Sequence, residues 1–149
     1  MITKTQQATI DSALSILGKE LNNTSAPFTN PIAVSSFCKL KLAAREQEVF
    51  GVLHLNSQHQ LIDFEEAFFG TIDAAAVYPR EIAKSCLYKN SAAVIFTHNH
   101  PSGIAEPSQA DRTITTRLVD ALQLIDVRTL DHIVVGANTS FSFAEKGWL

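Results

Sequence analysis

The sequence lacks the features that mark membrane-spanning and secreted proteins. Its longest apolar runs, at 49–53 and 92–96, are about five residues long, whereas a bilayer span needs roughly 20. The N-terminal residues lack the apolar segment of a secretory signal. Cysteine is scarce, with 2 in 149 residues, and Cys38 and Cys86 show no Cys-x-x-Cys spacing. We therefore expect a cytoplasmic protein with no membrane partner and with both thiols in its core.

An excess of positive charge is also missing. The 12 lysine and arginine residues are outnumbered by 15 aspartate and glutamate residues, which gives a formal net charge of -3. Such a balance does not attract nucleic acid, so binding to DNA or RNA is possible only through a local basic patch. Glycine and proline are few, at 6 and 5, while 46% of residues are hydrophobic. The chain therefore has enough apolar material for one folded core.

The first part of the chain predicts two helices. An apolar stripe through Ile10, Leu14, Leu17 and Leu21 predicts a helix that ends near residues 22–23. A polar connection follows, and Asn30 and Pro31 then supply the N-cap and first-turn proline of a second helix. We expect residues 1–29 to form an N-terminal helix with its connecting segment, and residues 30–149 to form the main domain.

Strands and helices alternate in the rest of the sequence. The expected elements are, in order, an inner strand at 48–56, a hairpin partner at 61–69, a helix from Pro79, a strand at 92–98, a long helix after Ser108, a strand at 130–135, and a short strand through Phe141 and Phe143. Glu65 and Glu66 are expected near the solvated end of their strand, and Leu87 on the same apolar side of its helix as Ile82 and Cys86. This alternation predicts an α/β sandwich with a sheet of mixed strand direction.

Residue types that bind metals lie at the end of the strand at 92–98 and after it. His98 and His100 are two residues apart, so both imidazoles point to the same side of an extended chain. Asp111 is three residues after the expected N-cap, Ser108, which places its carboxylate near the end of that strand. Two imidazoles and one carboxylate are a common three-ligand set for a catalytic zinc ion.

Each half of this pattern also has an ordinary explanation. Ser-x-x-Asp before an apolar helix is a capping box, and two histidines at a strand end can simply form hydrogen bonds in a turn. Their conjunction around the Pro-Ser-Gly turn at 101–103 favours a metal site. Several first-row ions bind such a set, so the residues by themselves do not select zinc.

The motifs resemble those of a known family. His98-Asn99-His100, seven residues, Ser108, two residues and Asp111 is similar to the JAMM metalloprotease signature of JAB/MPN domains. The RadC branch of that family is the closest match, since it also resembles this chain at Phe69-Gly70-Thr71, Tyr78-Pro79-Arg80-Glu81 and Asp131-His132-Ile133-Val134-Val135-Gly136. The resemblance covers about residues 31–149. It implies a JAB/MPN-like, cytidine-deaminase-like three-layer sandwich with a mixed central sheet flanked by helices.

The resemblance also implies roles for individual residues. His98, His100 and Asp111 would hold zinc, with no other cofactor, and Ser108 would donate a hydrogen bond to the oxyanion. An upstream glutamate would act as general base on a metal-activated water that cleaves a peptide, isopeptide or related amide bond of a peptide or protein substrate. Glu48 fits that position best, and Glu46 is the alternative because both lie on one face of the strand.

Other readings remain open at this point. A DNA-repair-associated or nucleic-acid-processing protein and a metal-binding scaffold without turnover are the alternatives to a hydrolase. Asn99 replaces the serine or threonine common in eukaryotic deubiquitinases, so we do not expect ubiquitin specificity to carry over. The chain resembles a short form without the N-terminal helix-hairpin-helix region. No pattern indicates the oligomeric state.

Other families that use a His-x-His pair do not fit the sequence. A metallo-β-lactamase site would have Asp-His where Ser102-Gly103 stands, an amidohydrolase barrel needs about 250 residues, and a cupin has no long helix. His54 is expected to be a buried, hydrogen-bonded histidine. The pair Asp131-His132 is expected to support the structure or the site, and Arg80 to lie on the surface.

Overall fold

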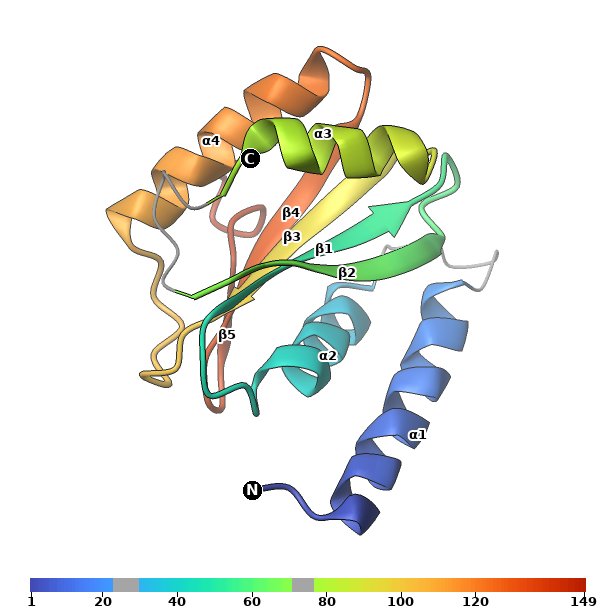
Figure 1. The fold of residues 1–149 in the computed structure, drawn as a ribbon, viewed down its shortest axis with the longest axis vertical. Coiled ribbons are helices and arrows are strands. Elements are labelled where there is room, and N and C mark those ends of the chain that lie inside the picture. The colour runs from blue at the N-terminus through green and yellow to red at the C-terminus, as the bar shows by residue number, and fades with distance from the viewer. Residues whose placement is uncertain (23–29, 71–76) are drawn as a thin grey trace.

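A five-stranded sheet with helices on both faces forms a three-layer α/β sandwich (Figure 1). The computed structural model describes residues 1–22, 30–70 and 77–149. The helices are α1 (Lys4–Leu21), α2 (Pro31–Leu42), α3 (Pro79–Tyr88) and α4 (Gln109–Gln123). The strands are β1 (Val49–Leu55), β2 (Leu61–Phe69), β3 (Ala93–Asn99), β4 (Arg128–Val135) and β5 (Ser140–Ser142). The predicted fold class is confirmed.

The sheet is mixed, as predicted. Its strand order is β2-β1-β3-β4-β5. Strand β1 runs antiparallel to both β2 and β3, β3 runs parallel to β4, and β4 pairs antiparallel with β5. Strand β3 is therefore the middle strand, and the carboxyl ends of β3 and β4 lie side by side with the beginning of β1 at one edge of the sheet.

Local sequence signals set the beginnings of the first two helices. In α2 the Asn30 side chain accepts a hydrogen bond of 3.2 Å from the amide of Ala33, and Pro31 occupies the first turn, as predicted. Helix α1 begins at a capping box between Thr3 and Gln6. The predicted polar connection at 23–29, the side chain of Leu21 and Thr71 lie outside the described residues.

Two apolar cores lie on opposite faces of the sheet because alternate strand residues point to opposite sides. On one face Phe50, Val52 and Phe96 pack against α3 and α4. On the other, Leu53 and Ile95 pack against α2, with half-buried residues of α1 beside them. Each core holds one free thiol, and burial raises the pKa of Cys38 to about 12 and that of Cys86 to about 11.

Two predictions about single elements are wrong. Glu65 and Glu66 do not lie at a solvated strand end, since their side chains are only 29% and 23% exposed. Glu65 instead accepts a hydrogen bond from Ser85 of α3, a partner that the strand pattern does not reveal. Leu87 is 59% exposed rather than inward. The long helix expected after Ser108 is α4, which ends at Gln123.

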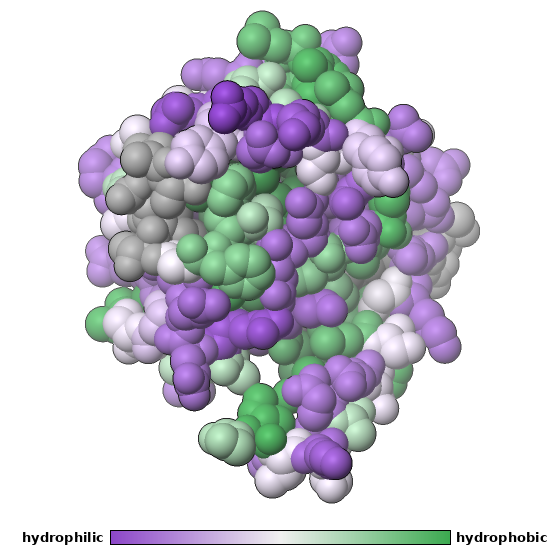
Figure 2. Space-filling model, in the orientation of Figure 1, coloured by the Kyte–Doolittle hydropathy of each residue, from purple (hydrophilic) through white to green (hydrophobic). Residues whose placement is uncertain are grey.

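Polar side chains cover much of the surface visible in Figure 2, with smaller apolar areas between them. Across residues 1–22, 30–70 and 77–149, every helix is too short or too polar to cross a bilayer.

Candidate metal centre

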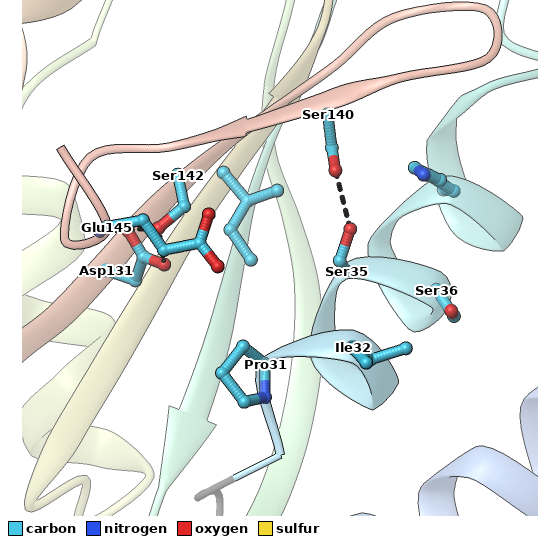
Figure 3. Close-up of a pocket in the computed structure, with 10 residues that line it drawn as sticks. Pro31, Ile32, Ser35, Ser36, Asp131, Ser140, Ser142 and Glu145 are labelled. Carbon is cyan, nitrogen blue, oxygen red and sulfur yellow. Dashed lines mark hydrogen bonds between the residues drawn. The ribbon is translucent and has the colours of Figure 1, made fainter.

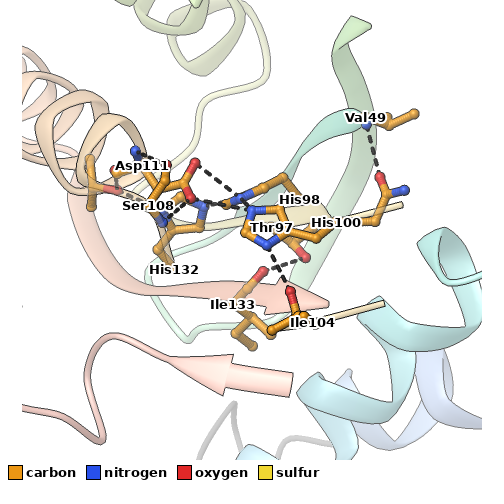
Figure 4. A network of polar contacts seen from close by, with 11 residues as sticks. Val49, Thr97, His98, His100, Ile104, Ser108, Asp111, His132 and Ile133 are labelled. Atoms are coloured by element: carbon orange, nitrogen blue, oxygen red, sulfur yellow. Dashed lines mark hydrogen bonds and ion pairs between the residues drawn. The ribbon is translucent and has the colours of Figure 1, made fainter. Parts of the chain in front are cut away.

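Four side chains converge where β3 ends, β1 begins and α4 begins. Glu48, His98, His100 and Asp111 each offer one ligand atom, and these atoms all lie within 4.8 Å of one another. Glu48 directly precedes β1. The two histidines come from the end of β3 and the residue after it, and Asp111 belongs to the first turn of α4 (Figure 4). The structure thus brings Glu48 to three residues that lie about fifty positions further along the sequence.

The two histidines face each other through their inner nitrogens. The distance between Nε2 of His98 and Nε2 of His100 is 3.0 Å. The side chain of His98 is fully buried, and that of His100 is 17% exposed. On its outer side, Nδ1 of His100 lies 2.9 Å from the carbonyl oxygen of Ile104. Because a carbonyl only accepts hydrogen bonds, Nδ1 carries a proton, and Nε2 is the nitrogen that could offer a lone pair to a cation in the cluster.

The loop between the strand and the helix holds that carbonyl in place. The Val135 carbonyl accepts from the amide of His100 at 2.9 Å, and the Gly103 carbonyl accepts from the amide of Ala137 at 2.9 Å. Gly136 lies against this loop so closely that a Cβ atom there would be 2.5 Å from the Gly103 oxygen. The end of β4 therefore fixes the loop that orients His100.

Asp111 acts as a helix cap and faces the histidines at the same time. Its Oδ2 accepts a hydrogen bond of 2.7 Å from the Ser108 amide, and the Ser108 hydroxyl accepts one of 3.1 Å from the Asp111 amide. The same carboxylate lies 3.2 Å from Nε2 of His98 and 3.3 Å from Nε2 of His100. The capping box that the sequence shows thus also fixes a carboxylate between two imidazoles.

Asp111 and the histidines shift each other's pKa values. Burial of Asp111 would raise its pKa, but hydrogen bonds from His100 and His98 outweigh it and hold the pKa well below its usual value. A hydrogen bond to Asp111 raises the pKa of His100, although burial of the ring opposes this. A carboxylate that stays ionised beside two imidazole nitrogens makes a place for a cation, and the donor set fits a divalent first-row ion.

The two candidate glutamates differ in position. Glu46 is exposed, whereas Glu48 is partly buried and reaches the cluster. The Glu48 carbonyl accepts a hydrogen bond of 2.8 Å from the Gly70 amide, and Phe50, two residues further, pairs with His98 in the sheet. This register places Glu48 next to the end of β3. The geometry favours Glu48 over Glu46 as the acidic residue of the site.

Asn99 is a site residue whose role the sequence analysis missed. It lies between the two histidines, so its side chain leaves the other face of the strand, where it is 2% exposed. Its Oδ1 accepts a hydrogen bond of 2.8 Å from the Val49 amide, and its Nδ2 donates to the carbonyls of Gln47 and Arg45. Asn99 therefore ties the segment that carries Glu48 to the strand that carries the histidines. The residue type is the signal that could have suggested this role, because an asparagine side chain offers both hydrogen-bond donors and an acceptor.

We expect Asn99→Ala to destabilise the protein by about 1–3 kcal/mol, because the buried Val49 amide loses its acceptor. Urea unfolding followed by circular dichroism measures this change. The exposed Asn138, in the turn after β4, provides the control; Asn138→Ala should stay within about 0.5 kcal/mol of the unmodified protein. Equal effects from the two substitutions would contradict the role given to Asn99.

The remaining predicted residues lie outside the cluster. His54 is buried and makes hydrogen bonds of 2.8 Å with Ser91 and 2.9 Å with Glu65, so the prediction of a hydrogen-bonded histidine is confirmed. Asp131 accepts hydrogen bonds from the backbone amides of His132 and Ala144. Arg80 has an 84% exposed side chain, as expected for a surface residue.

A cavity of about 240 Å³ lies on the opposite face of the sheet, between α2 and strands β4 and β5 (Figure 3). A hydrogen bond of 2.6 Å between Ser35 and Ser140 crosses it. None of the four clustered side chains lines this cavity. Solvent instead reaches the cluster directly, past the partly exposed His100 and Glu48.

Comparisons with known proteins agree on one family. The family model described as the RadC-like JAB domain matches residues 28–148. A UPF0758 protein of Vibrio cholerae is 62% identical over 115 residues, which cover 77% of this chain and 72% of that protein. The UPF0758 protein YfjY of Escherichia coli is 51% identical over 145 residues, covering 97% of this chain and 91% of that protein.

Other relatives are longer than this chain. A UPF0758 protein of Saccharophagus degradans is 58% identical over 121 residues, which cover 81% of this chain but only 54% of that protein. The chain thus spans about half the length of some curated relatives that it matches. The names of these three relatives state no activity.

Proposed function

The chain belongs to the family of RadC-like JAB domains, and from this premise we propose that it is a divalent-metal-dependent hydrolase of the JAMM type that cleaves an amide bond. The substrate class is a peptide or protein, with a peptide, isopeptide or related amide as the scissile bond, and the proposed ion is zinc. The observation that carries this proposal is the convergence of a carboxylate base candidate on a His-His-Asp donor set, all within 4.8 Å.

The proposed division of roles follows from the contacts. His98, His100 and Asp111 are fixed by the sheet and by the first turn of α4, so they are the ligands. When bound in such a set, a zinc ion polarises a carbonyl and lowers the pKa of water to about 7. Glu48 then takes the proton from water and passes it to the leaving nitrogen, because it lies within reach of the cluster and keeps partial contact with solvent.

Ser108 is the proposed oxyanion donor. Its hydroxyl oxygen accepts the capping hydrogen bond from the Asp111 amide, and accepting that bond leaves the hydroxyl hydrogen available to donate. The residue is exposed at the beginning of α4, next to a ligand. A donor fixed in this way acts most strongly where negative charge develops in the transition state.

We expect Ser108→Ala to lower turnover by about 10²-fold while the metal content stays unchanged. Steady-state hydrolysis and elemental analysis of the same preparation measure the two quantities. Thr3→Ala is the matched control, since Thr3 forms the same kind of capping box at α1, away from the site. Parallel loss of metal and turnover in Ser108→Ala would contradict the separation of roles.

The activity itself is tested with metal-loaded protein and two libraries of fluorogenic substrates, one with peptide bonds and one with lysine isopeptide bonds. The proposal expects cleavage of at least one class, and no cleavage by a His98→Ala variant treated in the same way. Cleavage equal to that of the variant across both libraries would refute the proposed activity.

A further inference from the structure

A buried histidine lies directly behind one of the proposed ligands. Nε2 of His132 is 2.8 Å from Nδ1 of His98, the nitrogen that faces away from the cluster (Figure 4). The parallel pairing of β3 and β4 places His132 opposite Phe96. Its ring is stacked on Phe143 at 4.8 Å and lies edge-on to Phe50 at 5.6 Å, and it is fully buried. Aromatic side chains thus enclose the buried ring.

The contact continues beyond His132 and returns to the site. Nδ1 of His132 lies 2.6 Å from the hydroxyl of Thr115, which is 2% exposed on the inner face of α4. That hydroxyl donates a hydrogen bond of 2.6 Å to the carbonyl oxygen of Asp111. The chain of contacts thus runs from the side chain of one proposed ligand to the backbone of another.

The last contact sets the direction of all the others. A carbonyl oxygen only accepts, so the single hydrogen of the Thr115 hydroxyl is used there and its oxygen must accept from His132. Nδ1 of His132 therefore carries the ring proton, and Nε2 of the neutral ring is the acceptor. Nδ1 of His98 must then donate, which leaves the lone pair of His98 on Nε2, where the cluster lies.

We propose that His132 and Thr115 are positioning residues, which hold His98 in the tautomer and orientation that direct its Nε2 lone pair at the bound cation. This inference rests on the proposed metal-dependent function. A metal-bound histidine usually donates its outer N–H to a carboxylate, a backbone carbonyl or water. Here a second imidazole accepts that hydrogen bond, and its own tautomer is fixed by a threonine whose hydroxyl is already committed to the backbone.

The sharpest test is Thr115→Val, which removes the hydroxyl and keeps the shape of the side chain. Without an acceptor at its Nδ1, His132 can move its proton to Nε2, where it opposes the N–H of His98 and favours the wrong tautomer of that ligand. We expect zinc affinity, measured by competition with a chelator, to fall about 10- to 100-fold.

Thr116→Val is the matched control. Thr116 follows in the same helix and makes the same kind of bond, from its hydroxyl to the carbonyl of Arg112, at 3.1 Å. It is exposed on the outer face of the helix. Its replacement should leave the zinc affinity unchanged. Equal losses in the two valine variants would overturn the proposal, since they would reflect the helix rather than the histidine contact.

A second measurement reads the tautomer without any metal. Nitrogen-15 NMR of the metal-free protein should show His98 with its proton on Nδ1, and the Thr115→Val variant should show a shift of that proton towards Nε2. A rescue variant, His132→Gln, retains an acceptor and a donor and should keep more zinc affinity than His132→Leu. An unchanged tautomer in Thr115→Val overturns the proposal even where the affinity falls.

The two readouts also separate this inference from the proposed function. Wild-type protein that binds zinc but cleaves no amide bond would refute the hydrolase and leave the positioning roles supported. Wild-type protein with the Nε2–H tautomer of His98 would overturn the positioning roles, whatever the protein hydrolyses.

Discussion

Glu48→Gln is expected to abolish nearly all hydrolysis while the protein keeps its metal. General acid-base catalysis contributes about 10²- to 10⁴-fold to a rate, and an amide in place of the carboxylate cannot take up the proton. The three proposed ligands are untouched by this substitution, so one ion per chain should remain. Comparison of turnover and zinc content in the same sample measures both effects.

Glu46→Gln is the natural control for that experiment. Glu46 lies two residues earlier, carries the same charge and is exposed outside the cluster. We expect its turnover to remain near that of the unmodified protein. A large loss in Glu46→Gln together with normal activity in Glu48→Gln would reverse the assignment of the base.

His100→Ala is expected to remove the bound ion and, with it, the activity. The substitution deletes one of three donors and also exposes Asp111 to water, so the zinc content should fall from about one ion per chain towards zero. Elemental analysis after dialysis measures it. Hydrolysis should fall to the background rate, because the remaining groups cannot activate water at neutral pH.

His59→Asn serves as the control for His100→Ala. His59 lies in the turn between β1 and β2, with a φ of 61°, and asparagine tolerates that backbone conformation. Its replacement should leave the metal content as it is. Retention of a full complement of zinc by His100→Ala would remove His100 from the ligand set.

Much of this arrangement was predictable because it depends on local rules. The spacing of His98 and His100 places both rings on one side of a strand, and the structure shows both at the cluster. Ser108 and Asp111 form the expected capping box. Local sequence rules are therefore sufficient to predict that the three proposed ligands lie close together.

The contacts that hold the ligands were not predictable in the same way. His132 meets His98 only through the register of β3 and β4, which depends on how the intervening helix and turns bring the chain back. Asn99 bonds to residues about fifty positions earlier. The sequence pattern defines which face a side chain occupies, but not which neighbour it finds there.

The same limitation explains the errors. Glu65 was expected near a solvated strand end, yet Ser85 of α3, Lys89 directly after α3 and His54 of β1 lie around it. Leu87 fits the apolar side of its helix by spacing, but it is 59% exposed in the folded chain. Long-range packing decided both positions.

The shared use of Asp111 has a consequence for how the ion comes and goes. Its carboxylate is held by the Ser108 amide at the beginning of a fifteen-residue helix, and both imidazoles belong to or directly follow a buried strand. These elements draw their stability from apolar packing and not from coordination, in contrast to a zinc finger, which unfolds when its metal is lost. Chelation should therefore yield an intact apoprotein, and different ions can be exchanged reversibly in one scaffold.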